Sequence, residues 1–232
     1  MYQHVLDRAG IGWGTRLLDC GCGAGSFLSL AVKGGASVRG IDASEELVEI
    51  ARRRMPDGDL RVGNIDALPW ADNTFDVVTG LSSFQFADNH VQALREARRV
   101  SRDTVVIVVP ARLADSGIPR VLTAVSSLFA AEDLAALRTS GMYALSPADA
   151  LEEAMDIAGL RVRDDAEVDS SAVLADTETA VRAFLAAGAV GLAVRQSGEK
   201  AVTAALREGI APFVAADGRV RLAGWYRIVL AH

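Results

Sequence analysis

An acid and three alternating glycines stand together near the start of the chain. Residues 17–25 read LLDCGCGAG, so Asp19 follows two leucines and precedes Gly21, Gly23 and Gly25. Glycines at every second position let the backbone turn sharply and approach a ligand closely, because no Cβ stands in the way. The stretch predicts a buried strand, a loop that holds a nucleotide-like ligand, and a helix whose N-terminus faces that ligand. A glycine turn that only joins a strand to a helix is the alternative.

The acid before the loop bears on which ligand the loop would hold. A dinucleotide site uses the spacing G-x-G-x-x-G or A, with a pyrophosphate on the helix N-terminus. Here Gly25 comes one position early and Ser26 holds the usual place. The Asp19 carboxylate would repel a pyrophosphate, whereas it suits a ligand that carries an ammonium group. The loop therefore favours S-adenosylmethionine, and a nicotinamide dehydrogenase is a weaker alternative.

Two further acids follow the next two expected strands. Residues 37–42 predict a strand that ends in Asp42, at about the twenty-residue spacing typical of an acid that accepts ribose hydroxyls. Residues 60–63 predict the third strand, and Asp66 follows it within the run NIDALPWADNTFDVV. Ribose binding is the favoured role of Asp42, and a strand-end acid without a ligand is the alternative.

These residues together resemble the class I S-adenosylmethionine-dependent methyltransferases. The first motif of that family, D-x-G-x-G-x-G, is matched by Asp19, Gly21, Gly23 and Gly25. The run around Asp66 is similar to the family's adenine-binding segment and fourth strand. The resemblance is good over roughly residues 10–110, and over the remainder it extends only to the general layout of helices and strands. Within the family it points to the small-molecule branch, which methylates quinones, lipids and natural products.

The resemblance implies a cofactor site and a reaction. S-adenosylmethionine would be the cofactor and S-adenosylhomocysteine its product. Asp42 would accept from both ribose hydroxyls, and the adjacent Ala43 belongs to the same cofactor-binding set. Asp66 would accept from the adenine amino group, and the Ala67 backbone N–H would donate to a ring nitrogen. The backbone carbonyl of Leu81, or of its neighbour Gly80, would hold the methionine ammonium.

The acceptor side of the site is expected after the fourth strand. Methyl transfer is an in-line attack on a sulfonium-bound methyl, so it needs a base only for an acceptor that keeps its proton near neutral pH. His90 is the candidate base, and a solvent-exposed residue at the start of a helix is the alternative. Phe84, Gln85 and Phe86 would border either the acceptor pocket or the core. An acceptor with an oxygen, nitrogen or carbon nucleophile is consistent with this chemistry.

The elements that must position these residues predict an α/β fold. We expect a doubly wound, mostly parallel, seven-stranded Rossmann-like sheet, with later strands at residues 75–79, 104–109, 160–168 and 221–230. Ser44 and Asn89 are expected to cap helices, and residues 146–149 (SPAD) predict a capping box.

One segment exceeds what a minimal fold of this kind needs. Apolar residues at helical spacing between 118 and 129 predict an amphipathic helix. We expect a single domain over residues 1–232, with a core of 10–110 and 146–232 and a helical lid insertion at about 111–145. A surface helix packed on the core is the alternative to a lid. Residues 177–210 predict two more helices, which would complete the cover or form a homodimer contact.

Composition excludes some partners. The 24 basic and 30 acidic residues give a net charge of −6, which is unlike a nucleic-acid-binding surface. The loop after the fourth strand lacks the Asn/Asp-Pro-Pro-aromatic motif of enzymes that methylate bases or glutamine amides. The sequence predicts no metal site, no membrane span and no signal peptide, and its two cysteines, Cys20 and Cys22, suit a reducing compartment. These features predict a cytoplasmic enzyme with a small-molecule acceptor. A protein that keeps the fold without transferring methyl, as a cyclase-like scaffold or a regulator, is the alternative.

Overall fold

The computed structural model describes residues 1–130, 132–133 and 141–232, and it divides into two compact units. Unit 1 comprises residues 1–109, 142–168 and 227–232. Unit 2 comprises residues 110–141 and 169–226. Each unit has its own hydrophobic core.

Unit 1 is built on a seven-stranded sheet whose strand order is β3-β2-β1-β4-β5-β9-β6. Its strands are β1 (Arg16–Cys20), β2 (Ser37–Asp42), β3 (Asp59–Val62), β4 (Phe75–Leu81), β5 (Ser101–Ala111), β6 (Val162–Asp169) and β9 (Trp225–Ala231). The pairs β1–β2, β1–β4, β2–β3 and β4–β5 are all parallel. From β1 the chain adds β2 and then β3 on one side, and β4 then returns to pair with β1 on its other side. In open α/β sheets a ligand crevice forms at such a switch point.

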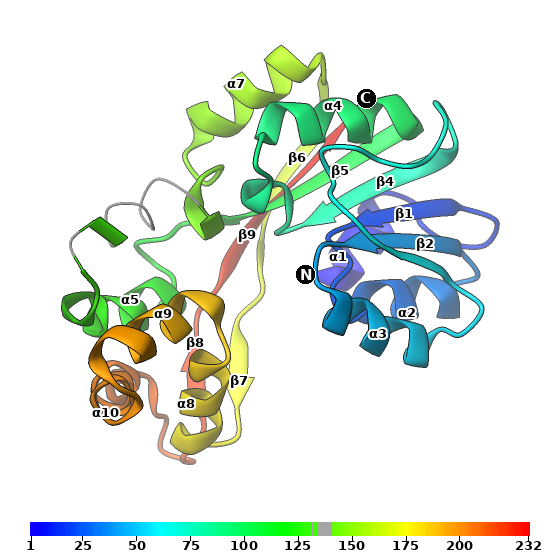
Figure 1. The fold of residues 1–232 in the computed structure, drawn as a ribbon. Helices are drawn as coiled ribbons and strands as arrows, with labels where there is room; N and C mark the ends of the chain where they lie inside the picture. Colours follow the sequence, from blue (N-terminus) through cyan, green and yellow to red (C-terminus); the bar gives the residue numbers. More distant parts are fainter. Residues whose placement is uncertain (131, 134–140) are drawn as a thin grey trace. The chain divides into compact units, whose positions relative to one another are not determined.

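Helices cover both faces of this sheet, as Figure 1 shows. They are α1 (Tyr2–Arg8), α2 (Ser26–Lys33), α3 (Glu45–Arg54), α4 (His90–Val100) and α7 (Ala148–Ala158), with short 3₁₀ turns η1 (Phe84–Phe86) and η3 (Gly141–Tyr143). Figure 1 places α4 and α7 on one face and α1, α2 and α3 on the other. Strand β1 is buried from Leu17 to Cys20, as expected for a strand covered on both faces. The expected doubly wound, mostly parallel sheet is therefore confirmed.

Local sequence signals account for the starts of two helices, α3 and α4. The side chains of Ser44 and Asn89 accept hydrogen bonds from the backbone N–H groups of Leu47 and Gln92, so both expected caps are confirmed. The expected capping box at residues 146–149 is wrong, because Pro147 is the N-cap of α7 and no side chain caps that helix. In α3, Leu47 is 39% exposed and Val48 is buried. Val48 shares its face with Ala51 at the spacing of one helical turn.

Two strand predictions need correction. The single strand expected over residues 221–230 is two strands, β8 (Val220–Leu222) and β9, which lie in different sheets. They separate because the carbonyls of Ala223 and Gly224 accept from Gly117 and Ser170 instead of from a ladder partner. Strand β5 was expected to close before Pro110, but it continues to Ala111. A proline near a strand end removes only one ladder donor, so the strand tolerates it.

Unit 2 is a helical unit with one antiparallel pair of strands. It contains α5 (Gly117–Ala124), η2 (Ser126–Leu128), β7 (Ala172–Leu174), α8 (Thr177–Leu185), α9 (Gly188–Ser197), α10 (Glu199–Ile210), η4 (Ala211–Phe213) and β8. Strands β7 and β8 pair antiparallel. The core of the unit includes Val121 and Val125 from the first segment and Phe184, Leu206 and Ile210 from the second.

The second unit is larger than the expected insertion of residues 111–145. It also takes residues 169–226, which the sequence assigned to the core, because the helices of both segments share the apolar cluster around Val121 and Leu206. Residues 177–210 form three helices where two were expected, and the helix expected over 118–129 ends at Ala124. Residues 131 and 134–140 of the expected lid lie outside the described part of the chain.

The described helices are short. No single one of them is long and apolar enough to cross a membrane. One bent pair of helices, Thr177–Leu185 with Val190–Ser197, is together long and apolar enough to span a membrane, by length and composition only.

Candidate functional site

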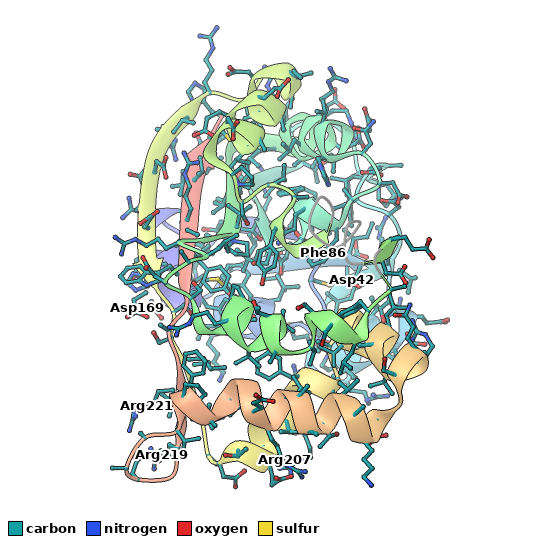
Figure 2. The ribbon with its side chains drawn as sticks, turned by 90° about the vertical axis from the view of Figure 1, so that its left-hand side faces the viewer. Asp42, Phe86, Asp169, Arg207, Arg219 and Arg221 are labelled. Carbon is teal, nitrogen blue, oxygen red and sulfur yellow. The ribbon has the colours of Figure 1, made fainter. Side chains whose placement is uncertain are left out.

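A cleft of about 400 Å³ opens in unit 1 where β1, β2, β3 and β4 end. Figure 2 labels two of its lining residues, Asp42 and Phe86. The lining residues come from four loops: Gly21, Asp42, Ala43, Gly63, Asn64, Ile65, Ser82, Ser83, Phe86, Ala87 and Asp88. Since parallel strands present their carboxyl ends at one edge, the topology itself brings these loops together.

The glycine loop turns through three left-handed residues. Gly21, Gly23 and Gly25 have φ angles of 76°, 51° and 76°, a region that other L-residues rarely adopt. The N–H groups of Gly21 and Cys22 both donate to the Ile41 carbonyl, at 2.8 and 3.0 Å, which ties the loop to β2. Gly25 is the N-cap of α2, so the helix begins directly behind the loop. The expected strand, glycine turn and helix are thus present.

The three glycines differ in what surrounds them. A Cβ on Gly21 would lie 2.3 Å from the Cβ of Ser83, and a Cβ on Gly25 would lie 2.6 Å from the Met55 methyl group. A Cβ on Gly23 would meet no protein atom within 4 Å. Gly21 and Gly25 are therefore required by packing, whereas the space beside Gly23 is open to a ligand.

Asp42 is held by the backbone on both sides. Its Oδ2 accepts from the Gly23 N–H at 2.8 Å, and its Oδ1 accepts from the Ser44 N–H at 2.9 Å. A carboxylate has about four lone-pair sites, so each oxygen keeps the capacity to accept one more hydrogen bond. The carboxylate is consequently fixed in orientation and still able to bind a pair of hydroxyls. Ala43 follows it in the wall of the cleft.

Asp19 lies beneath the glycine loop and is not one of the residues that line the cleft. It is 2% exposed, and the Thr79 hydroxyl donates to its Oδ1 at 2.7 Å. Burial raises the pKa of Asp19 to about 7, while the hydrogen bond from Thr79 opposes this shift and the nearby Asp42 carboxylate adds to it. The carboxyl group therefore titrates near neutral pH.

The segment expected to bind adenine lies partly in the wall of the cleft. Asn64 and Ile65 line the cleft, whereas Asp66 and Ala67 do not. Asp66 Oδ2 accepts from the Asn89 N–H at 3.3 Å, and its Oδ1 is buried with no hydrogen-bond partner among the described residues. The Ala67 N–H already donates to the Asn64 carbonyl at 3.3 Å. Asp66 Oδ1 can therefore still accept a hydrogen bond. The Ala67 N–H could donate to a ligand only by giving up its long hydrogen bond to the Asn64 carbonyl.

The loop after β4 supplies polar groups that sequence reasoning missed. Leu81 ends β4 in register with Val108, and Ser82 then adopts a positive φ of 56°. The hydroxyl oxygens of Ser82 and Ser83 are buried without a partner in the described part of the chain, and both residues line the cleft. Such backbone strain and unpaired polar atoms gather at ligand sites. The sequence signal that could have identified these groups is the pair of serines directly after the fourth strand.

The expected acceptor residues separate into buried and exposed ones. Phe84 is buried in the core beside β4, Gln85 is 1% exposed, and Phe86 is 59% exposed and lines the cleft. His90 begins α4, is half-buried, and does not line the cleft. Its Nε2 lies 3.1 Å from the Gln85 carbonyl oxygen, which can only accept, so Nε2 is the donor and Nδ1 is the nitrogen left to act as a base.

The part of the chain that carries this cleft matches known proteins. Residues 18–109 match the family described as "Methyltransferase domain". A malonyl-[acyl-carrier protein] O-methyltransferase of Erwinia pyrifoliae is 36% identical over 100 residues, which are 43% of this chain and 38% of that protein. A demethylmenaquinone methyltransferase of Renibacterium salmoninarum is 34% identical over 105 residues, which are 45% of this chain and 44% of that protein. The match spans less than half the length of these curated relatives.

Solved structures resemble the fold over the whole chain. The Bacillus subtilis YcgJ protein gives a TM-score of 0.64 at 17% identity and covers 99% of this chain and 96% of that one. The [4+2]-cyclase SpnF gives a TM-score of 0.60 at 18% identity and covers 100% of this chain and 79% of that one. At these identities the likeness concerns the fold alone.

Proposed function

We propose that the protein transfers a methyl group from S-adenosylmethionine to a small-molecule acceptor, because residues 18–109 match the methyltransferase-domain family and the two curated relatives are methyltransferases. One observation carries the proposal. The Asp42 carboxylate is held by the Gly23 N–H beside a cleft of about 400 Å³, at the switch point of the sheet. That volume and that edge of the sheet suit an adenosyl ligand.

The residues of the cleft fit S-adenosylmethionine as the cofactor of this family. When bound, it supplies an electrophilic methyl group on a sulfonium. The open space beside Gly23 lets main chain approach the ligand, and Asp42 binds the two ribose hydroxyls. Ala43 and Ile65 provide apolar contact, and the free Oδ1 of Asp66 accepts from the adenine amino group. The Leu81 carbonyl holds the methionine ammonium, and Asp19 contributes negative charge from beneath the loop.

Positioning and water exclusion do most of the catalytic work in this proposal. An in-line displacement is accelerated chiefly by holding the acceptor atom against the methyl group. Phe86 borders the acceptor, and Nδ1 of His90 removes the acceptor proton where the acceptor carries one. The small-molecule assignment is supported by the names of the two curated relatives and by the net charge of −6, which disfavours nucleic acid. We further propose that unit 2 acts as a helical lid that excludes water during transfer.

Methyl transfer is tested by following the methyl group itself. The protein is incubated with methyl-labelled S-adenosylmethionine and a panel containing a malonyl thioester, a demethylated quinone and phenolic and amine acceptors. We expect S-adenosylhomocysteine to form in equal amount to a labelled product with at least one acceptor. Tight cofactor binding with no S-adenosylhomocysteine across the panel would contradict transfer to these acceptor classes and favour a scaffold or regulator.

A further inference from the structure

We propose that Thr79 is a positioning residue for the cofactor, because its hydroxyl holds the Asp19 carboxylate ionised and oriented beneath the glycine loop. This inference rests on the proposed function, since it assigns Asp19 the task of attracting the ligand ammonium. It adds a residue that no motif of the sequence marks, in the middle of an apolar strand.

The contact between the two residues follows from the sheet register. Asp19 in β1 is the Cα partner of Thr79 in β4, so their side chains leave adjacent strands at the same level. The Thr79 hydroxyl donates to Asp19 Oδ1 at 2.7 Å and lies 3.3 Å from the Leu18 carbonyl. Thr79 is fully buried and Asp19 is 2% exposed. A hydrogen bond between such groups is shielded from water and is therefore strong.

The surroundings of Asp19 make this hydrogen bond consequential. Asp42 faces it from β2 and disfavours a second negative charge. Cys20 follows it at the end of β1 and Cys22 lies in the glycine loop, and the pKa of each thiol is raised, so neither is a thiolate near neutral pH. Among the described residues, Thr79 is the one group that donates a hydrogen bond to the Asp19 carboxylate, so Oδ2 has no protein donor there. A buried carboxylate in this setting stays ionised only with a donor such as Thr79 or with a cationic ligand.

The consequence is a link between pH and cofactor affinity. The ammonium of the ligand is attracted by the ionised form of Asp19, so affinity should fall as pH drops through the pKa of about 7. Removing the Thr79 hydroxyl withdraws a hydrogen bond from the charged form and moves that midpoint upward. The expected displacement is about one to two pH units, the size of one charge-assisted hydrogen bond.

The test is calorimetric titration with S-adenosylhomocysteine, which keeps the ammonium, between pH 5.5 and 9. In the wild type the association constant should fall by about tenfold per pH unit below the midpoint. In Thr79→Val the midpoint should move upward, so that the variant binds more weakly at pH 7 and recovers toward the wild-type affinity at pH 9. Thr79→Ser should restore the wild-type profile, and Asp19→Asn should lack the step.

Two controls keep the result decisive. If Thr79→Val does not fold, Thr79→Ala removes the same hydroxyl without placing a methyl group against the carboxylate. The ¹³C shift of the Asp19 carboxyl in the ligand-free protein reports its pKa directly. An unchanged midpoint in the Thr79 variants, with affinity lowered equally at every pH, would overturn the inference and leave Thr79 a packing residue. A wild type that binds no S-adenosylhomocysteine at any pH would instead contradict the proposed function.

Discussion

The backbone N–H of Gly23 donates a hydrogen bond of 2.8 Å to the Asp42 carboxylate, so the glycine loop after β1 is tied to the end of β2. The same carboxylate accepts from the Ser44 N–H, which fixes its orientation in the absence of a ligand. A site whose acceptors are already oriented loses less conformational entropy on binding. This bond therefore joins the glycine loop and the acid at the end of β2 in a single preorganised unit.

The glycine loop predicts opposite effects for two similar substitutions. Gly21→Ala should lower the free energy of unfolding by about 2–5 kcal/mol, because the new Cβ strains a positive φ and collides with Ser83. Gly23→Ala should cost only about 1–2 kcal/mol, because it adds strain without a collision. Chemical denaturation measures both. Calorimetry should then show that folded Gly23→Ala binds S-adenosylmethionine more weakly, and wild-type affinity in that variant would contradict a ligand beside Gly23.

His90 is predicted to act in turnover and not in cofactor binding. His90→Ala should lower kcat by about 10²–10⁴-fold on a protonated acceptor, because proton removal belongs to the transition state. Affinity for S-adenosylmethionine should change little, and the defect should shrink on an acceptor that is already ionised. His4→Ala, which removes an exposed histidine of α1, is the matched control. A loss below about threefold would leave positioning as the mechanism.

The proposed lid predicts a change in hydrogen exchange. Amides of α5 should exchange more slowly when S-adenosylhomocysteine and an acceptor are bound together, because closure orders a low-stability element. The buried strand β5 serves as the internal reference, since its exchange should not depend on ligand. Exchange in α5 that is equally slow with and without ligands would make the segment structural.

The sequence predicted the parts of the fold that depend on local pattern. The glycine loop and the caps at Ser44 and Asn89 follow from residue types at fixed spacing, and the mostly parallel sheet agrees with the expected fold class. The division of the chain did not follow, because the core of unit 2 joins residues 110–141 to 169–226 through contacts between segments distant in sequence. The spacing of apolar residues shows which face of a helix is buried, but it does not show which other segment packs against that face.

The candidate site shows the same limit. Asp42 was found because an acid at the end of a second strand has a recognised spacing from the glycine loop. Thr79 and Ser82 were missed, because a single hydroxyl in or after an apolar strand carries no pattern. Thr79 meets Asp19 only through the register of β1 and β4, and the unpaired hydroxyl of Ser82 is seen only once the loop after β4 is folded.

The most direct test of the central claim is the affinity of S-adenosylmethionine for the wild type and for Asp42→Ala, with NAD as the competing ligand. We expect one-to-one binding of S-adenosylmethionine to the wild type and no binding of NAD. Asp42→Ala should weaken the binding by about 2–4 kcal/mol, because a charge-assisted pair of hydrogen bonds to the ribose is lost. Glu45→Ala, which removes an exposed carboxylate at the start of α3, should bind as the wild type does. Unchanged affinity in a folded Asp42→Ala, or binding of NAD in place of S-adenosylmethionine, would contradict the account.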